Sequence, residues 1–386
     1  QSSPQIDNIS IVGTADKFHS LSDHSIRFIQ QYRNMKNHNF SIGFEETYFS
    51  THFKNKNTEN SSLNTSFKTQ NGYLYSLFIR NSWSLKNRWK FDTGIRYSYF
   101  DNLDKLYFEP RISIIYKIKQ NLSLELSYGE HNQFIHKEDK ENNSNFNINS
   151  RFLSSSKIPT ILSKNFQAGT HWNKNDYNLS TTFYLKSLSN FFKPEWSFSF
   201  EDYLSDNNEN IDPGYGKIKG LEVQFRKKYG MITGWISYHN SNTKYQLSDF
   251  NEGKLFFADY DKNHELKIVM LGQIFNANFS ASWVFSSGRP FSSLENLYVE
   301  SGSGYEIFSK GDYNNERVKS SHHLDISLVK SLEMSKVQIE LGFSIYNLYN
   351  KKNIAHKRYN PFSRELSVKD ISMFGITPSI FTKISF

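Results

Sequence analysis

Hydrophobic and polar residues alternate with a period of two along most of this chain. The pattern is clearest at 91–99, 122–128, 324–328 and 337–345. Because successive side chains of a β-strand point to opposite faces, each of these segments has one apolar and one polar face. The alternation therefore predicts an all-β protein built of amphipathic strands.

The predicted strands are connected by segments of two kinds. We count about 16 strands from Ile6 onward, each of roughly 10 to 14 residues, whereas soluble strands average about 5 to 6. Short connections lie at 33–38, 85–88, 119–121, 173–176, 227–230, 272–274 and 332–335. Long polar connections lie at 55–71, 136–163, 194–216, 248–260, 288–320 and 351–370. Short and long connections are predicted to alternate strictly along the chain.

This alternation is typical of a transmembrane antiparallel outer-membrane β-barrel, which has tight periplasmic turns and long extracellular loops. A Greek-key sandwich does not require short and long connections to alternate. An even strand number places both termini on the periplasmic side. Aromatic residues at strand ends would form girdles at the level of the lipid headgroups. These are Tyr97, Tyr99 and Phe100, and Trp83 and Trp89.

Composition changes this picture little. The 37% hydrophobic content and the mean hydropathy of -0.64 would suit a soluble or disordered chain, but 16% aromatic residues argue against disorder. No run of about 18 apolar residues occurs, which excludes a transmembrane helix. The absence of cysteine excludes disulfides, thiolate metal sites and cysteine nucleophiles. Gln1 opens a polar stretch and not a signal peptide, as expected for a processed chain or a fragment.

The net charge of +8 comes from 46 basic and 38 acidic residues spread along the chain. Nucleic-acid binding requires clustered basic residues, so we exclude a nucleic-acid partner. A surface that faces outer-membrane lipid and lipopolysaccharide accounts better for the excess.

The final predicted strand has one apolar face and ends in an aromatic residue. Ile380, Ile384 and Phe386 lie on this face, which resembles the signal recognised by the barrel-assembly machinery. Phe386 could alternatively be an ordinary strand end in any β protein.

Several sequence pieces occur in the order found in one known family. The segment at 214–245 reads GYGKIKGLEVQFRKKYGMITGWISYHNSNTKY. The other pieces are GIRYSYF, LYFEPRISIIYKIKQNLSLELSYGEHNQF, SSGRPFS, HHLDISLVK, GFSIYNLYNKKN and ITPSIFTKISF. Over 72–386 the chain resembles the C-terminal barrel portion of TonB-dependent receptors, particularly those of Bacteroidetes.

This resemblance implies a barrel of about 22 strands, a plug domain inside it and energised import through contact with TonB. No plug or TonB box is recognisable, and about six strands are missing relative to that barrel. Residues 1–386 are therefore interpreted as a partial or reduced barrel. It is the C-terminal part of a longer transporter, one piece of a split one, or a receptor-derived barrel that no longer transports.

The leading hypothesis for function is uptake of a scarce nutrient, either a siderophore, a peptide or an oligosaccharide. A surface lipoprotein lid, a plug or missing barrel segment, and other outer-membrane subunits are possible partners. The alternative is a non-transporting structural or assembly subunit of a larger outer-membrane complex, and a passive porin is a third hypothesis. We predict no enzyme and no cofactor, because no set of acid, base and nucleophile emerges.

Charged residues on the polar strand faces are expected to line the lumen, since a charge at mid-membrane costs about 2–4 kcal/mol. The candidates are Arg80, Arg96, Glu125, Glu340 and Lys383. Ligand contacts are expected from aromatic residues in the long connections, because binding residues concentrate on loops. The candidates are Trp196, Tyr203, Phe250, Tyr298 and Tyr305.

Two further patterns suggest metal chemistry but are better interpreted as structural. Oxygen donors alternate over 206–212 as in calcium loops, but Ile211 stands where the turn needs glycine and Lys217 where a glutamate is expected. His323 and Asp325 share a strand face from which His322 points away. No histidine spacing suggests zinc, and no metal site is predicted.

Overall fold

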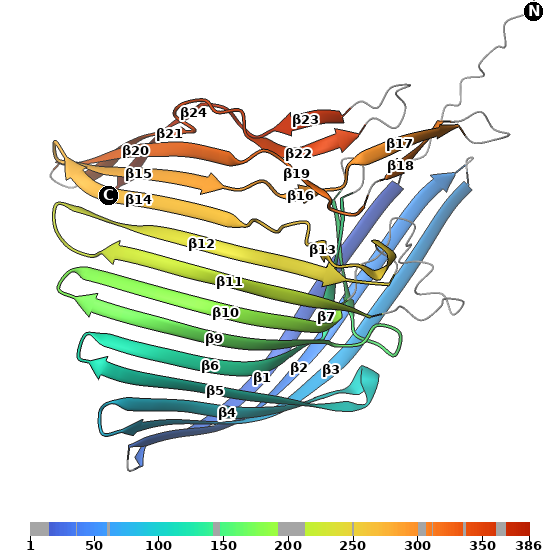
Figure 1. The fold of residues 1–386 in the computed structure, drawn as a ribbon, viewed down its shortest axis with the longest axis horizontal. Helices are drawn as coiled ribbons and strands as arrows, with labels where there is room; N and C mark the ends of the chain where they lie inside the picture. Colours follow the sequence, from blue (N-terminus) through green and yellow to red (C-terminus); the bar gives the residue numbers. More distant parts are fainter. Residues whose placement is uncertain are drawn as a thin grey trace, which may run out of the picture.

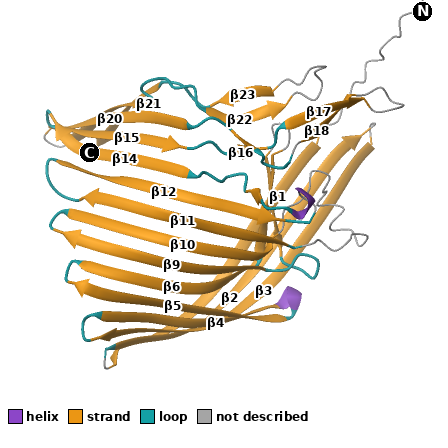
Figure 2. Ribbon diagram, in the orientation of Figure 1, coloured by secondary structure: helices purple, strands orange, loops and turns teal. Residues whose placement is uncertain are grey.

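One antiparallel sheet, curved around a central hollow, makes up most of the molecule (Figure 1, Figure 2). This computed structural model describes residues 15–35, 37–59, 62–141, 147–191, 213–248, 251–299, 306–310, 312–334, 337–359 and 368–386. Among these residues, no helix is long and apolar enough to cross a membrane. The all-β prediction is confirmed.

The main sheet contains 16 strands, and neighbours in the chain are mostly neighbours in space. Its first strands are β1 (Ala15–Met35), β2 (His38–Glu59), β3 (Ser62–Leu85), β4 (Trp89–Phe100), β5 (Lys105–Lys119) and β6 (Leu122–Gln133). They are followed by β9 (Ile161–Lys174), β10 (Tyr177–Phe191), β11 (Gly214–Lys227), β12 (Ile232–Gln246) and the short β13 (Phe256–Phe257). The last are β14 (His264–Ile274), β15 (Ala277–Ser286), β20 (Ser321–Met334), β21 (Val337–Tyr346) and β24 (Thr377–Ser385).

Small two-stranded sheets occupy the connections at one end of the main sheet. They are β7 (Ile135–Glu141) with β8 (Asn147–Leu153), β16 (Pro290–Phe291) with β19 (Glu316–Arg317), β17 (Leu294–Val299) with β18 (Glu306–Lys310), and β22 (Ile354–Tyr359) with β23 (Val368–Ser372). Two 3-10 turns, η1 (Asp101–Leu103) and η2 (Asn251–Gly253), lie at the same end. We call it the long-connection end.

The opposite end, which we call the short-turn end, carries tight hairpin turns (Figure 1). Lys86 and Asn87, between β3 and β4, both have positive φ angles of 48° and 54°. Two successive positive φ angles match the right-handed twist of paired strands, and asparagine tolerates that backbone well. The residues of this turn therefore favour its tight conformation without help from distant parts of the chain.

Two details of the predicted connections were wrong. The stretch at 55–71 is not a loop, because β2 and β3 remain paired from Asn55 with Ser66 to Glu59 with Ser62. The connection of β4 to β5 is short although it lies at the long-connection end, and Asp104 closes it with a φ of 47°. The strand predicted from Ile6 lies outside the described residues; fifteen strands run the length of the sheet, and the sixteenth is β13.

The register puts polar residues on one face of the sheet and apolar residues on the other. Arg96 lies opposite Glu109, whereas the preceding residue, Ile95, lies opposite Ile79. The apolar face is open, with Ile79 47% exposed, and the polar face is crowded, with Ser98 only 1% exposed. Crowding marks the concave side, so the hollow is polar and the outer wall is apolar. Soluble proteins have the opposite arrangement, and a barrel that faces lipid requires this one.

Aromatic side chains form two bands on the outer wall. At the long-connection side, the ring of Tyr75 stacks on those of Tyr73 and Tyr99, with centroids 6.0 and 6.4 Å apart. At the short-turn side, Trp83 and Trp89 both stack on Phe91. The nine-residue stretch from Tyr75 to Trp83 matches the about 9–11 residues of a transmembrane strand.

Phe100 does not belong to these bands, contrary to the sequence prediction. It is fully buried on the concave side in a cluster with Leu74 and Tyr107. Tyr97 and Tyr99 are odd-numbered residues of β4 and face outward, so the even-numbered Phe100 must face inward.

The main sheet has two open edges. Among the described residues, β1 pairs only with β2, and β24 pairs only with β21. Backbone groups along the outer sides of β1 and β24 therefore have no strand partner within the described part of the chain.

Candidate functional site

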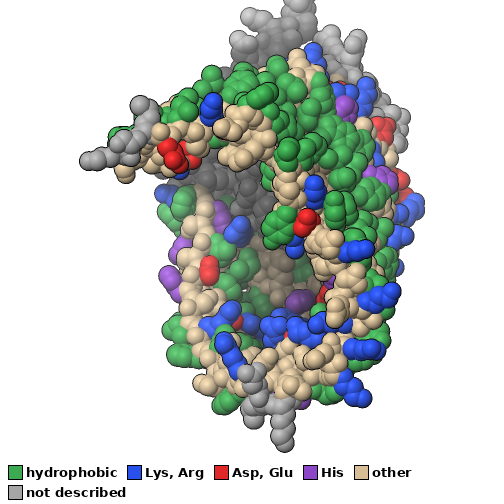
Figure 3. Space-filling view, turned by 90° about the vertical axis from the view of Figure 1, so that its left-hand side faces the viewer, with side chains coloured by type: hydrophobic (Ala, Val, Ile, Leu, Met, Phe, Trp, Pro, Cys, Tyr) green, Lys and Arg blue, Asp and Glu red, His purple; other side chains and the backbone are tan. Residues whose placement is uncertain are grey.

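The curved sheet encloses a hollow that is lined mainly by polar side chains (Figure 3). Seen from the short-turn end, it opens to the viewer, and Lys and Arg side chains gather on its lower wall (Figure 3). The register carries polar side chains onto the concave face of the long strands, so most of the wall is hydrophilic, and the apolar cluster around Phe100 is an exception.

Five alternating charges cross the concave face from β1 to β5, and we call them the charge ladder. Arg27 Nη2 lies 2.9 Å from Glu45 Oε1, and Arg96 Nη1 lies 3.0 Å from Glu45 Oε2. Arg96 Nε lies 3.8 Å from Glu109 Oε2, which is also 3.5 Å from Arg111 Nη2. The Glu45 and Glu109 side chains are 11% and 5% exposed, so each carboxylate relies on arginine for charge compensation.

Small side chains beneath Arg96 hold its guanidinium in place. Nη2 donates to Ser76 Oγ at 2.8 Å, and Nε donates to Ser98 Oγ at 3.3 Å. The guanidinium carbon also lies 5.9 Å from the centre of the Phe78 ring. A Cβ atom on Gly43 would come within 2.3 Å of that ring, so glycine is required for this packing. Arg96 is therefore fixed in position and not a mobile surface charge.

The other charges expected in the lumen also lie on the concave face. Glu125 Oε1 accepts from Ser113, and Glu125 Oε2 lies 3.2 Å from His171 Nε2. Glu340 lies 3.8 Å from Lys383 on the edge strand β24. Arg80 is 66% exposed and lies 3.6 Å from Asp92, and Lys383 is 67% exposed, so these two are the least buried of the five predicted charges.

A second polar group on the concave face is centred on His239. Its Nε2 lies 2.7 Å from the hydroxyl of Tyr184 and 3.7 Å from Glu222, and its Nδ1 lies 3.8 Å from Glu265. The alternation of polar and apolar residues is sufficient to place these four residues on the polar face. Their contacts with one another depend in addition on the register of the four strands that carry them. Neither this group nor the charge ladder is encoded in any single segment of the sequence.

The β7–β8 hairpin narrows the long-connection end of the hollow. It leaves β6 and, instead of extending outward, reaches β1, β2 and β3 on the other side (Figure 1). Nε2 of His19 on β1 lies 2.6 Å from the carbonyl oxygen of Arg151, and Gln70 on β3 accepts the Leu153 N–H at 3.0 Å. The hairpin is thus bound to the opposite wall.

Apolar packing seals the base of this hairpin. Phe134 and Leu153 join the buried cluster around Phe100. Beside it, His136 is 3% exposed, stacks on Phe152 and lies 3.0 Å from the hydroxyl of Ser154. Burial lowers the pKa of His136 to about 4, so its ring is neutral at pH 7.

A buried ion pair organises the connections farther along the chain. Asp261 is fully buried, and its Oδ2 lies 2.5 Å from Arg317 Nη2, while its Oδ1 accepts the Thr243 N–H. Arg317 Nη1 donates to the carbonyl oxygen of Gly288, and its guanidinium stacks over Phe257. A Cβ on Gly288 would lie 1.5 Å from a backbone oxygen, so the glycine of SSGRPFS allows a close backbone approach.

The histidines and aspartate near 322 stabilise a turn. Asp325 accepts the N–H of Asn347, and His323 lies 3.4 Å from Asp325. His322 instead contacts the hydroxyl of Tyr349. These contacts support the structural interpretation of the motif. Within the described ranges, no group of three or more potential ligands is arranged to bind a metal ion.

Several predicted residues cannot be compared with the structure. Trp196, Tyr203, Phe250, Tyr305 and the calcium-like stretch at 206–212 lie outside the described residues. Tyr298 belongs to β17, where only the backbone is described. At the C-terminus, Ile380 and Ile384 point outward from β24, and Phe386 is 98% exposed.

Comparisons with known proteins agree with this architecture. Similar structures include the ferric yersiniabactin uptake receptor FyuA from Yersinia pestis, with a TM-score of 0.68, 10% identity, and coverage of 97% of this chain and 56% of that one. The outer membrane transporter YddB from Escherichia coli has a TM-score of 0.63, 11% identity, and coverage of 95% and 54%. BauA, the ferric preacinetobactin receptor from Acinetobacter baumannii, has a TM-score of 0.58 and 12% identity, and the match covers 97% of this chain and 55% of that one. At these identities the likeness concerns the fold.

The chain thus spans about half the length of these structures. Curated protein sequences give no match. The sequence model of the family described as TonB dependent receptor-like, beta-barrel, matches residues 5–348. Because this match covers most of the chain, the protein belongs to the TonB-dependent receptor β-barrel family and is an integral outer-membrane protein.

Proposed function

We propose that this chain forms the wall of an outer-membrane receptor that imports a scarce nutrient in an energised step. The observation that carries the proposal is the largely polar concave face, narrowed at the long-connection end by a hairpin fixed to the opposite wall through Gln70. Such a hollow offers a hydrated path, and a fixed constriction suits selective uptake more than free diffusion.

The nutrient is a siderophore, a peptide or an oligosaccharide, and the receptor performs no catalytic step of its own. The similar structures from Yersinia pestis and Acinetobacter baumannii are a ferric yersiniabactin uptake receptor and a ferric preacinetobactin receptor. Ferric siderophores are therefore the first class to test. Aromatic residues of the long connections, such as Tyr298, remain our candidates for ligand contact.

We also propose that further strands complete the barrel between β1 and β24. An unpaired strand edge in hydrocarbon costs several kcal/mol per backbone group, so a membrane sheet must close. A plug inside the closed barrel would meet the charge ladder, and a lipoprotein lid would cover the long-connection end. The exposed apolar face of β24, with Ile380 and Ile384, would be recognised by the barrel-assembly machinery.

Barrel closure is testable by crosslinking, because the chain has no cysteine of its own. A single cysteine at Ser25 on β1 or at Ser379 on β24 would be oxidised with cysteines introduced into strands outside this segment. Crosslinks of β1 and β24 to different strands support closure by additional strands. Direct crosslinking of positions 25 and 379 would show that the two edges meet without any.

Transport is tested in the native bacterium with a deletion of the gene and a complementing copy. Uptake of labelled ferric siderophores, peptides and oligosaccharides is measured with and without a protonophore. We expect one class to be lost in the deletion strain and to require the proton gradient in the complemented strain. Unchanged uptake of all three classes, with the receptor assembled in the wild-type membrane, would reject the proposal.

A further inference from the structure

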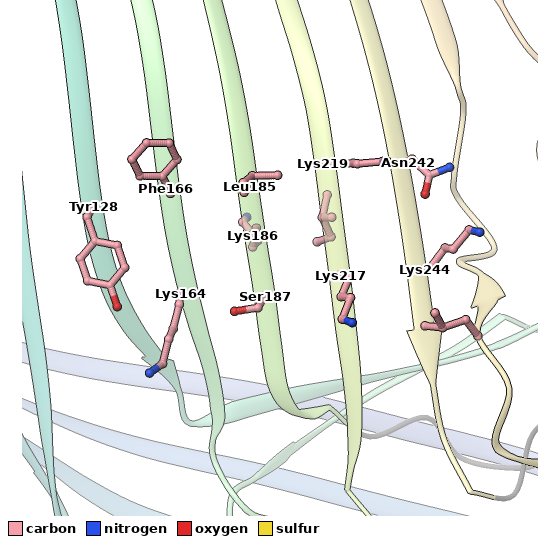
Figure 4. Close-up of a pocket in the computed structure, with 12 residues that line it drawn as sticks. Tyr128, Lys164, Phe166, Leu185, Lys186, Ser187, Lys217, Lys219, Asn242 and Lys244 are labelled. Carbon is pink, nitrogen blue, oxygen red and sulfur yellow. The ribbon is translucent and has the colours of Figure 1, made fainter.

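One row of the concave face carries a cation at each end. Figure 4 shows β6 to β12 from the outer wall, with Leu185 of β10 on the near side. Because successive side chains of a strand point in opposite directions, the next residue, Lys186, belongs to the concave face. The strand register places four residues in its row, namely Arg111, Gly129, Asn165 and Lys186. Only a glycine and a neutral amide therefore separate the two cations.

Arg111 is the open end of the charge ladder. Its side chain is 48% exposed, whereas that of Arg96 on the neighbouring strand is 22% exposed. Both register partners of Arg111, Gly94 and Gly129, lack a side chain that could cover the guanidinium. Its one carboxylate contact among the described residues is 3.5 Å from a Glu109 oxygen that Arg96 also approaches. N–H donors of Arg111 therefore remain available to a ligand.

The surroundings of the row have an excess of positive charge. The ladder consists of three arginines and two glutamates, so one of its positive charges is uncompensated. Lys186 adds another, because no carboxylate of the described chain lies within 4 Å of its ammonium group. Both Arg111 and Lys186 are close enough to His131 to act on its ring electrostatically. Since like charges repel, an anion between these two cations would stabilise the row.

The two cations can reach one ligand group. Three strand spacings, about 14 Å in all, separate their backbones. Both side chains are long, and side chains on the concave face of a curved sheet converge toward the hollow. Gly129 in the same row leads along its strand to Phe134 at the base of the β7–β8 hairpin. A solute that has passed the hairpin therefore meets this row next.

We propose that Arg111 and Lys186 form a subsite that binds a negatively charged oxygen group of the imported nutrient, either a carboxylate or a deprotonated catechol. A guanidinium binds such groups through parallel N–H donors, and an ammonium group adds a point charge. The inference rests on the proposed function. Within each of the three nutrient classes, it selects anionic members over neutral ones.

The test titrates the whole receptor, purified from native outer membranes into detergent, with pairs of ligands that differ in charge. The pairs are ferric tris-catecholate with ferric tris-hydroxamate, a glutamate-rich peptide with its glutamine analogue, and oligogalacturonate with its methyl ester. The variant combines Arg111→Gln and Lys186→Gln. The control combines Lys117→Gln and Arg226→Gln, which removes the same charge from exposed residues of the concave face at the short-turn end. Heat-modifiable migration in gels verifies that each protein is folded.

We expect the wild type to bind the anionic member of one pair more tightly than the neutral member. The variant should bind that anion at least about tenfold more weakly, and the control should bind it as the wild type does. Unchanged affinity in the variant would overturn the proposal, because the two cations would then pair with another part of the receptor. An equal loss in variant and control would also overturn it, since the whole hollow would then attract anions.

A wild type that prefers the neutral member of every pair, or binds no ligand of any pair, would overturn the proposal as well. Energised uptake of the same ligands is measured in the deletion strain complemented with each protein. Uptake that persists while the anion preference fails would leave the proposed function in place, so the two failures are distinguishable.

Discussion

Arg96 on β4 reaches over β3 to Glu45 on β2, with 3.0 Å between Nη1 and Oε2. The two residues are separated by a whole strand, and Ser76 of that strand supports the guanidinium from below. Three consecutive strands are therefore joined by side chains as well as by backbone hydrogen bonds.

Replacing Arg96 with alanine should destabilise the barrel by about 1–3 kcal/mol, because Glu45 and Glu109 would remain buried with less compensation. Urea unfolding in lipid vesicles, followed by tryptophan fluorescence, measures the change. Arg80→Ala is the matched control: Arg80 is 66% exposed, so its loss should cost no more than about 0.5 kcal/mol. Equal effects of the two substitutions would contradict the rigid role assigned to Arg96.

The β7–β8 hairpin should loosen as the pH falls from about 6.5 to about 4. The folded state holds His136 neutral with a pKa of about 4, whereas in an opened hairpin the ring titrates near its ordinary pKa of 6.5. The open form therefore binds more protons in this interval, and up to about 3 kcal/mol of local stability is lost. Burial lowers the pKa of His19 as well, which acts in the same direction.

Hydrogen exchange of the hairpin amides at pH 7.5 and pH 5 measures this loosening. His136→Gln should remove most of the pH dependence while the turns at the short-turn end exchange as in the wild type. If protection of the hairpin is the same at both pH values, the buried neutral histidine does not contribute to closing it.

Arg317→Lys should loosen the connections around β16 and β19. Lysine retains the charge but cannot contact Asp261, the Gly288 carbonyl and the Phe257 ring together. We expect proteolysis of these connections in intact cells to be about tenfold faster, which corresponds to roughly 1.4 kcal/mol of local stability. Lys254→Ala serves as control, because the ion pair of Lys254 with Glu252 is exposed on both sides. Cleavage at the control rate would show that the planar contacts of Arg317 are dispensable.

Tryptophan fluorescence can test which face of the sheet meets lipid. A variant that retains only Trp89, which is 39% exposed on the outer wall, should be quenched strongly by brominated lipids in vesicles. A variant that retains only Trp235 should be quenched little, because its register partner Arg226 faces the hollow. Strong lipid quenching of Trp235 would mean that the two faces are assigned the wrong way round.

Local alternation was sufficient to predict the fold class and the face on which each side chain lies. Arg96 and Glu125 each stand between apolar residues in their strands, so alternation places them on the face opposite to those apolar residues. The same rule would have placed Phe100 inside, since it differs by one position from Tyr99. Phe100 was assigned to the outer girdle because it is aromatic, although its position next to Tyr99 places it on the opposite face.

The contacts of the site could not be predicted in this way. The bond of Arg96 to Glu45 depends on the register of β2, β3 and β4 together, which no single segment encodes. The inward path of β7 and β8 depends on contacts with β1 and β3. One of these contacts joins Leu153 to Gln70, which are more than eighty residues apart in the sequence. In 55–71, polar residues suggested a loop, but cross-strand pairing overrides composition when the facing segment is also extended.

The strict register of the sheet restricts how this chain can change in length during evolution. Losing one residue within β4 would turn Arg96 toward lipid and Ile95 toward the hollow, and the shift would reach every later position of that strand. Insertions and deletions inside the strands are therefore expected in pairs, which preserve parity. The long connections carry no such constraint, so related receptors can differ there freely while their walls keep the same length.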